Sequence, residues 1–248
     1  MTTDALISCR GLIPAFADQQ YLGEGLDLDI GHGEIIAIIG PDHAGKAEWL
    51  TTLGGVSSPQ QGRLQLFGNG LEDFDRSDWI RIRTRLAYLD PDSSLLSAAN
   101  ARQNVMLPVR YHQLPREQVT EEDAIELLNR LEVTDQLSLP AYLKRDQRFR
   151  IAIARSLILE PAGLLLDTPF KHMGLHARRR FQSFLVDRVR QQDMTLIVAT
   201  DDIDFVVEQA DTALFASMEG IHCFDDTDDI RRTDLYAVKK FLSECRLS

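Results

Sequence analysis

The sequence predicts an α/β fold, in which a core sheet of parallel strands carries an inserted helical subdomain, and three observations support this. Short, continuously apolar runs recur at 33–39, 164–167 and 194–200, as is typical of strands buried on both faces. Segments with apolar residues at helical spacing lie between these runs. The block from about 94 to 159 changes character and holds two of the helical patterns. Strands that alternate with helices around such a block define this fold class.

The N-terminal part is predicted to consist of strands that lead into the first helix. Residues 6–40 are expected to form strands, and the run 33–39 is rich in β-branched residues, which favours a buried strand. A helix follows from 47 to 53, and 64–68 forms a further strand that ends in a turn. The expected turns within the first segment lie at Gly11, Gly31 and Gly33.

Three helices are predicted in the middle and C-terminal parts. Two lie before the strand 164–167, and one lies between that strand and the strand 194–200. Residues 120–131 have helical periodicity, and Thr120 and Asp123 offer a variant of the capping box at its start. A second amphipathic helix runs from 149 to 159 and ends near a proline. Between the last two strands, 177–192 is predicted to be a helix with a basic face.

Composition and charge exclude several classes of protein. With 248 residues and 44% apolar content, the chain is long enough to bury a large core in one globular unit with a subdomain. A net charge of −11 argues against nucleic acid as the main partner, because phosphate backbones need clustered cations. Three widely spaced cysteines show no metal-ligand pattern and favour a reducing cytosol. We expect neither a signal peptide nor a membrane span, because the start lacks a basic segment and no window approaches ~18 apolar residues.

Residues 40–48 form a glycine-rich loop between the predicted strand 33–39 and the predicted helix. Gly40, Gly45 and Lys46 match the pattern Gly-x4-Gly-Lys-[Ser/Thr], whose backbone N–H groups wrap phosphates and whose lysine reaches the β- and γ-phosphates. The final hydroxyl of that pattern holds Mg²⁺. Here the position is Ala47, which has no hydroxyl, so the loop keeps its frame without its metal ligand.

Taken together, these segments resemble the ATP-binding subunits of ABC transporters over essentially the whole chain. Besides the loop, the resemblance depends on Leu-Ala-Tyr-Leu at 86–89 with 95–96 and 101–105, and on the helix 148–161 followed by the strand and loop 164–169. It implies a phosphate-loop NTPase fold of the ABC ATPase type. The expected division is a RecA-like nucleotide-binding core with a β-subdomain in 1–90 and 160–224, a helical signature subdomain in 91–159, and a C-terminal tail in 225–248.

A narrower resemblance points to the ATPase subunits of bacterial MCE-type (Mla) lipid transporters. Asp-Thr-Pro-Phe at 167–170, Asn-Val-Met-Leu-Pro at 104–108 and Ala-Val-Lys-Lys-Phe-Leu at 237–242 are similar to those subunits. Lipoprotein-release and cell-division ABC subunits share much of this pattern. The resemblance implies an integral membrane permease as partner and a cytoplasmic location, peripheral on the inner face of the cell membrane. The permease would dock near 91–110.

The chain departs from the ABC pattern at nearly every position to which the resemblance assigns chemistry. The signature Leu-Ser-Gly-Gly-Gln reads Leu-Lys-Arg-Asp-Gln at 143–147, so both glycines that approach the opposing γ-phosphate are replaced. The glutamine of the Q-loop, the general-base glutamate, the aspartate of the D-loop and the switch histidine align with Pro91, Thr168, Gly174 and Asp201.

These departures predict that ATP hydrolysis is absent or severely impaired. A missing general base alone costs ~10²–10⁴ in rate, and Thr168 cannot accept a proton at neutral pH. Lys46, Gly40, Gly45 and Asp167 remain, which suffices for weak phosphate binding and a poorly held Mg²⁺ at Asp167, so at most weak ATP binding is expected. In the family an aromatic residue stacks on adenine; Phe16 is the nearest candidate, and packing in the core is the alternative.

The charges of these replacements predict a dimer contact. ABC subunits pair head to tail, and this chain carries acidic groups on its phosphate-loop side and basic groups in its signature. A homodimer, or a pair with a paralogous ABC ATPase subunit, would bring together Asp42, Glu48 and Asp201 with Lys144 and Arg145. Three functions stay open: a non-catalytic scaffold or regulator of a transport complex, a slow ATPase that uses Asp90, Asp92 or Glu48, and a soluble regulator detached from any transporter.

Overall fold

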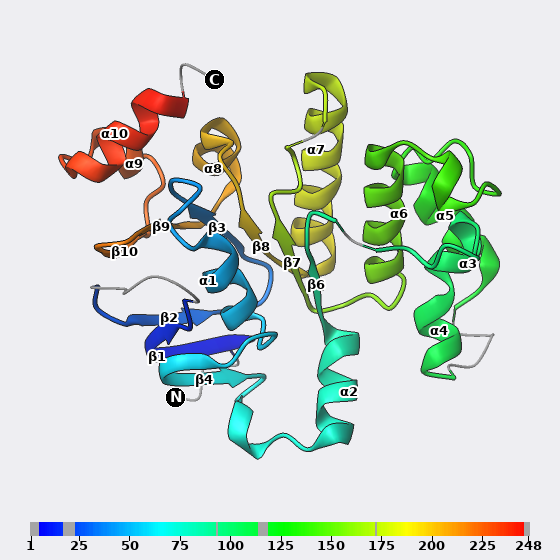
Figure 1. Cartoon of the computed structure of the whole chain (residues 1–248), viewed down its shortest axis with the longest axis horizontal. Coiled ribbons are helices and arrows are strands. Elements are labelled where there is room, and N and C mark those ends of the chain that lie inside the picture. Colours follow the sequence, from blue (N-terminus) through cyan, green and yellow to red (C-terminus); the bar gives the residue numbers. More distant parts are fainter. Residues whose placement is uncertain (1–4, 17–22, 93, 114–118, 172, 246–248) are drawn as a thin grey trace.

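The computed structural model describes residues 5–16, 23–92, 94–113, 119–171 and 173–245. Two sheets lie side by side, with α1 packed between them (Figure 1). The strands are β1 Ile7–Pro14, β2 Leu26–Ile30, β3 Ile35–Ile39, β4 Pro59–Leu66, β5 Asn69–Gly70, β6 Leu86–Leu89, β7 Gly163–Asp167, β8 Thr195–Ala199, β9 Thr212–Ser217 and β10 Gly220–Phe224. The helices are α1 Lys46–Leu53, α2 Arg76–Arg85, α3 Ala101–Val105, α4 Leu107–Tyr111, α5 Glu121–Arg130, α6 Arg145–Leu157, α7 Leu175–Gln192, α8 Ile203–Gln209, α9 Asp229–Arg232 and α10 Tyr236–Cys245.

The larger sheet confirms the predicted α/β class. Its strand order is β10-β9-β3-β8-β7-β6, and every neighbouring pair is parallel except β10 with β9. The smaller sheet, β2-β1-β4-β5, is antiparallel. The three central strands β3, β7 and β8 are buried at every residue, as their continuous apolar runs predict.

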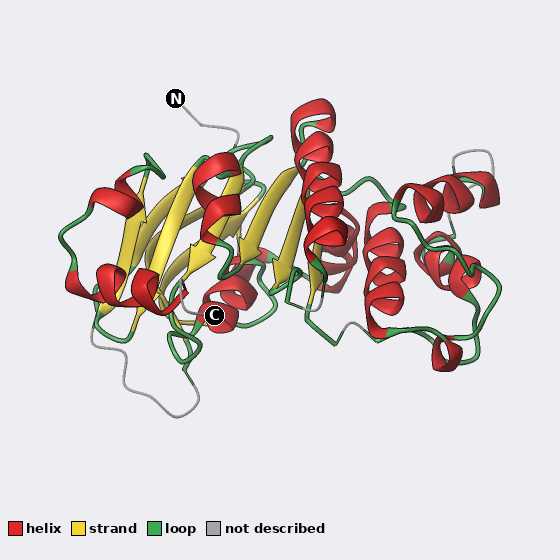
Figure 2. Cartoon of the chain, turned by 90° about the horizontal axis from the view of Figure 1, so that it is seen from above, coloured by secondary structure: helices red, strands yellow, loops and turns green. Residues whose placement is uncertain are grey.

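Two apolar clusters fill the faces of the larger sheet. One side, with Trp49 and Leu50 of α1, packs the large sheet against the small antiparallel sheet. The other side packs the sheet against α7, α8 and the C-terminal helix α10, whose Phe241 ring lies 5.7 Å from that of Phe215. Helices α3 to α6 stand beyond the β6 edge, next to α7 (Figure 2).

Several predicted elements have different bounds in the structure. The helix predicted from 149 begins at Arg145 and ends at Leu157, so the last three residues of the predicted signature segment, 145–147, lie in its first turn and Lys144 is its N-cap. The predicted capping box of α5 is confirmed, because Thr120 accepts from the Asp123 N–H and the Asp123 carboxylate accepts from the Thr120 N–H. The turn expected at Gly11 is wrong. Gly11, with φ 58°, lies at a β-bulge inside β1, where the register with β2 and β4 shifts.

Candidate functional site

The candidate site lies at the carboxyl ends of the parallel strands β3, β7 and β8. The loop 40–45 follows β3, Asp167 ends β7, and residues 200–202 follow β8. Because β3 pairs with β8 through Ile38 and Ala199, and β8 pairs with β7 through Ala199 and Asp167, the residues after these strands meet at one edge. Ligands of open α/β sheets bind at this edge.

The phosphate loop has the backbone that its glycines predict. Gly40 has φ 143°, and a Cβ there would lie 2.2 Å from the carbonyl oxygen of Ala216. Gly45 has φ 75°, in the left-handed region, and immediately precedes α1. The loop backbone is therefore held close to β9 on one side and opens onto the N-terminus of α1 on the other.

Lys46 is buried and already has partners within its own chain. Its side chain is only 6% exposed. The Nζ atom donates to the carbonyl oxygen of Gly40 and to Oδ1 of Asp201 at 2.8 Å. A second carboxylate oxygen, Oδ1 of Asp42, lies 3.8 Å away. The cation that the loop offers to phosphates is therefore neutralised by carboxylates of the same molecule.

Asp167 and Thr168 occupy the end of β7. Burial raises the pKa of the Asp167 carboxyl above its usual value, while a hydrogen bond with the Thr168 side chain and the charge of Lys46 act against this rise. Thr168 has φ 43°, which is strained for a β-branched residue. Next to them, burial and the charge of Asp167 raise the pKa of Tyr88 to about 12. No side chain that accepts a proton at neutral pH stands at position 168.

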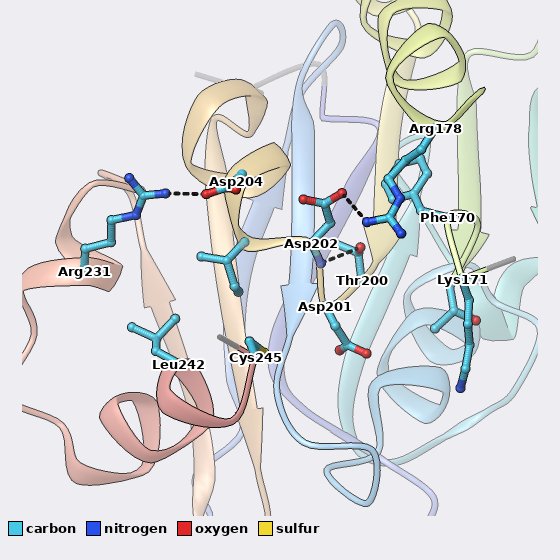
Figure 3. Close-up of a pocket in the computed structure, with 12 residues that line it drawn as sticks. Phe170, Lys171, Arg178, Thr200, Asp201, Asp202, Asp204, Arg231, Leu242 and Cys245 are labelled. Atoms are coloured by element: carbon cyan, nitrogen blue, oxygen red, sulfur yellow. Dashed lines mark hydrogen bonds and ion pairs between the residues drawn. The ribbon is translucent and has the colours of Figure 1, made fainter. Parts of the chain in front are cut away.

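A cavity of about 690 Å³ adjoins the site and runs from the end of β7 to α10 (Figure 3). Asp201, Asp202 and Asp204 line it, together with the C-terminal residues Leu242 and Cys245. Two of the carboxylates are fixed by arginines, because Arg178 lies 3.3 Å from Asp202 and Arg231 lies 2.7 Å from Asp204. The third, Asp201, points away from these pairs in Figure 3 and contacts Lys46.

The residues predicted to stand at the Q-loop and signature positions come together next to Thr168. Pro91, Arg145 and Thr168 line one small cavity of about 20 Å³. Arg145 donates to Oδ1 of Asp92 at 2.9 Å, so it has a partner in its own chain. Gly174 is the N-cap residue of α7 and makes no side-chain cap.

Phe16 lies directly against the phosphate loop. A Cβ placed on Gly45 would lie 2.3 Å from Cε1 of the Phe16 ring, and the ring also packs on the apolar cluster around α1. The structure thus shows the packing role of Phe16 and leaves adenine stacking as a prediction. The proposed dimer contact stays a prediction as well: Asp42 is 84% exposed, Lys144 and Asp201 are exposed, and Glu48 is partly exposed.

Two features of the site were missed by the sequence reasoning. One is the contact of Asp201 with Lys46, and the other is the placement of Leu242 and Cys245 of α10 beside Asp201. The first could have been found from the strand alignment, since a parallel pairing of 35–39 with 195–199 brings the residues after both strands together. The second had no local signal, because it depends on how α10 packs.

The family of the chain follows from the segment that contains the phosphate loop 40–45 and β7. Residues 24–171 match the ABC transporter family. The chain belongs to the ABC transporter family. Among the residues that the structure describes, no helix is long and apolar enough to cross a membrane.

Curated members of the ABC family are similar to this chain at low identity. It is 29% identical over 191 residues to the methionine import ATP-binding protein MetN of Brucella abortus, covering 77% of this chain and 52% of that protein, so the chain spans about half of its length. It is 27% identical over 199 residues to the lipoprotein-releasing system protein LolD of Bacteroides fragilis, covering 79% and 91%. The probable ribonucleotide transport protein mkl of Mycobacterium leprae is 24% identical over 248 residues, covering 100% and 71%.

Solved ABC structures share the fold. A dimeric ATP-binding cassette in a post-hydrolysis state with ADP and Pi superposes with a TM-score of 0.78 at 21% identity, over 88% of this chain and 97% of the other. The cbiO1 protein of Clostridium perfringens, part of the ABC transporter complex cbiONQ, gives 0.76 at 23% identity, over 97% and 99%.

ABC cassettes use ATP with Mg²⁺, and the residues present do not fit that ion. Ala47 supplies no oxygen where the ABC loop has a hydroxyl, and the buried Asp167 is hydrogen-bonded by Thr168. Within the described ranges, no three side chains of His, Cys, Asp or Glu are grouped as a metal site. A phosphate entering the loop meets Lys46 with Asp201 already bound to it.

Proposed function

We propose that this chain is a cassette subunit of a membrane transport complex that acts as a scaffold or regulator and does not hydrolyse ATP. The observation that carries this proposal is the pair Asp167 and Thr168. The side chain after β7 is a hydroxyl held to Asp167, not a carboxylate free to take a proton from water. We further propose that 1–90 with 160–224 forms the nucleotide-binding core, 91–159 the signature subdomain and 225–248 a C-terminal appendage.

ATP turnover by the purified chain tests this proposal. We expect no phosphate release above that of a Lys46→Ala control, with or without Mg²⁺. Release by the native chain that Lys46→Ala abolishes would refute the proposal and favour the slow-ATPase alternative. That alternative has its own observation, because the Asp90 and Glu48 carboxylates are close enough to Asp167 to raise its pKa. Asp90→Asn and Glu48→Gln would then identify the substitute base.

A variant that restores the ABC pattern provides the positive control. Ala47→Ser, Pro91→Gln and Thr168→Glu together return the metal hydroxyl, the Q-loop amide and the general base. Turnover by this variant alone would show that the native residues, and not the fold, stop hydrolysis. Inactivity of both proteins would leave the signature segment 143–147 as the next set of residues to restore.

The proposed permease would dock near 91–110, in a groove of about 670 Å³ that is lined by residues of α2, β6, α4 and α6. Tyr111 lines this groove and is 71% exposed. We expect Tyr111→Asp to abolish co-purification with an integral membrane protein from detergent-solubilised membranes. Tyr142→Asp is the matched control, because Tyr142 is 81% exposed but does not line the groove. A native chain that never co-purifies with a membrane protein would favour the detached soluble regulator and refute the inner-membrane location.

Lipid is the proposed cargo, because 104–108, 167–170 and 237–242 resemble the ATPase subunits of MCE-type transporters. Lipid extraction and mass spectrometry of the purified complex test this. Phospholipid bound in stoichiometric amount supports lipid transport. A complex that carries no more lipid than an unrelated membrane protein purified in parallel counts against it.

The proposed assembly is a head-to-tail pair, with itself or with a paralogous cassette. The acidic phosphate-loop side of one copy would face Lys144 and Arg145 of the other. Because exposed ion pairs contribute only ~0–1 kcal/mol each, such a pair is expected to weaken as salt rises. Sedimentation in 50 mM and 1 M NaCl tests it. A dimer that persists unchanged in 1 M NaCl without nucleotide would refute the proposal that ion pairs hold the two copies together.

A further inference from the structure

The contact of Asp201 with Lys46 is the most unusual feature of the site. A lysine in a phosphate loop with no ligand bound would be left with its ammonium partly desolvated, and here that ammonium has a carboxylate 2.8 Å away. The Lys46 side chain is 6% exposed and that of Asp201 is 45% exposed. The ion pair therefore joins a buried ammonium to a carboxylate that is still partly open to solvent.

The backbone around Asp201 is fixed by bonds on both sides. Thr200 is 3% exposed, and its N–H donates to the carbonyl oxygen of Ile38 at 3.0 Å, which ties the segment to β3. Asp202 caps α8 by accepting from the Phe205 N–H and binds Arg178. With both neighbours held, the Asp201 carboxylate is directed at Lys46 by the fold.

We propose that Asp201 is an internal ligand of Lys46 that competes with phosphate groups and thereby sets the affinity of this site for nucleotides. A phosphate that binds Lys46 must displace the carboxylate or lie beside it, where the two negative charges repel each other. This inference deepens the proposed function and concerns binding, whereas the proposed function concerns hydrolysis. Lys46 thus has a carboxylate partner within its own chain with which a phosphate must compete.

Asp204 offers a matched control. It lies three residues further on, lines the same cavity and is also ion-paired, but its partner is Arg231 at 2.7 Å. Asp204→Asn therefore removes the same charge from the same cavity without touching Lys46. A general effect of net charge on anion binding would appear in both variants, and a specific effect only at Asp201.

Calorimetric titration of the full chain with pyrophosphate, and separately with ATP, tests the proposal. We expect Asp201→Asn, and Asp201→Ser as a second variant, to bind pyrophosphate about tenfold more tightly than the native chain, the range expected for a lost ion pair together with a lost repulsion. Asp204→Asn should stay within about twofold. Adding Lys46→Met to Asp201→Asn should remove the gain.

Four results would overturn the inference: equal affinities in native and Asp201 variants, an equal gain in Asp204→Asn, a gain that survives Lys46→Met, or no measurable binding in any folded variant. Circular dichroism of each variant establishes that it is folded. ATP turnover measured on the same proteins keeps the two proposals apart. Hydrolysis by the native chain refutes the proposed function alone. A pyrophosphate affinity that is the same in the Asp201 variants and the native chain refutes this inference alone.

Discussion

Replacing Lys46 by methionine in the nucleotide-free protein is expected to destabilise the fold. Lys46→Met keeps a long unbranched side chain and removes only the ammonium. The carbonyl oxygen of Gly40, which accepts from Nζ, lies in a buried setting and loses this partner. An unpaired buried acceptor costs about 1–3 kcal/mol. Asp201 is 45% exposed and regains water, so loss of its ion pair adds no more than ~1 kcal/mol.

The expected loss is therefore about 1–4 kcal/mol, and each kcal/mol lowers the melting temperature of a chain of this size by roughly 2–4 °C. Thermal unfolding of the native chain, Lys46→Met, Asp201→Asn and the double variant gives the coupling energy of the pair. We expect a coupling of about 0.5–1 kcal/mol. A Lys46→Met protein as stable as the native chain would refute the reasoning, because it would mean that the ammonium holds nothing in the free protein.

Three further predictions concern other parts of the chain. Burial raises the pKa of Asp167 above 3.8, so ionising this carboxyl in the folded chain lowers its stability as the pH rises. In thermal scans, Asp167→Asn should therefore melt at a higher temperature than the native chain at pH 7. This difference should vanish near pH 4, where the native carboxyl is protonated. Phe241→Ala should lose about 3–5 kcal/mol in urea unfolding, since the ring is 4% exposed. Thr120→Ala should cost about 1 kcal/mol in urea unfolding by removing the N-cap of α5, whereas Thr120→Ser should keep the native stability.

The sequence predicted β7 and β8 well because burial on both faces leaves a continuous apolar run. β7 and β8 fall within one residue of the predicted runs. Gly11 was misjudged for a physical reason. A positive φ serves a bulge as well as a turn, and a Cβ on Gly62 would lie 2.2 Å from the Gly11 carbonyl oxygen. That close approach joins residues far apart in sequence, so no local pattern shows it.

The site residues could be named from the sequence, but their partners could not. Asp201 was expected at a dimer contact because its charge is opposite to that of the signature segment. Inside the chain it has a nearer cation, Lys46 at 2.8 Å, which strand pairing brings to the same edge. Arg145 similarly has Asp92 of its own chain at 2.9 Å. Side chains of this length choose among several neighbours, and only the packed structure decides which one they reach.

The pairing of Lys46 with Asp201 also bears on whether the departures of this site from the ABC pattern arose by random loss or belong to a maintained structure. A lysine buried beyond nine-tenths is costly unless its charge is compensated. In this chain the Asp201 carboxylate provides that compensation at 2.8 Å. Most other residues at position 201 would leave the ammonium without a carboxylate at this distance. An aspartate directed at the lysine, in a fold whose core strands are buried and whose helix caps are formed, supports the proposal of a maintained non-hydrolysing subunit.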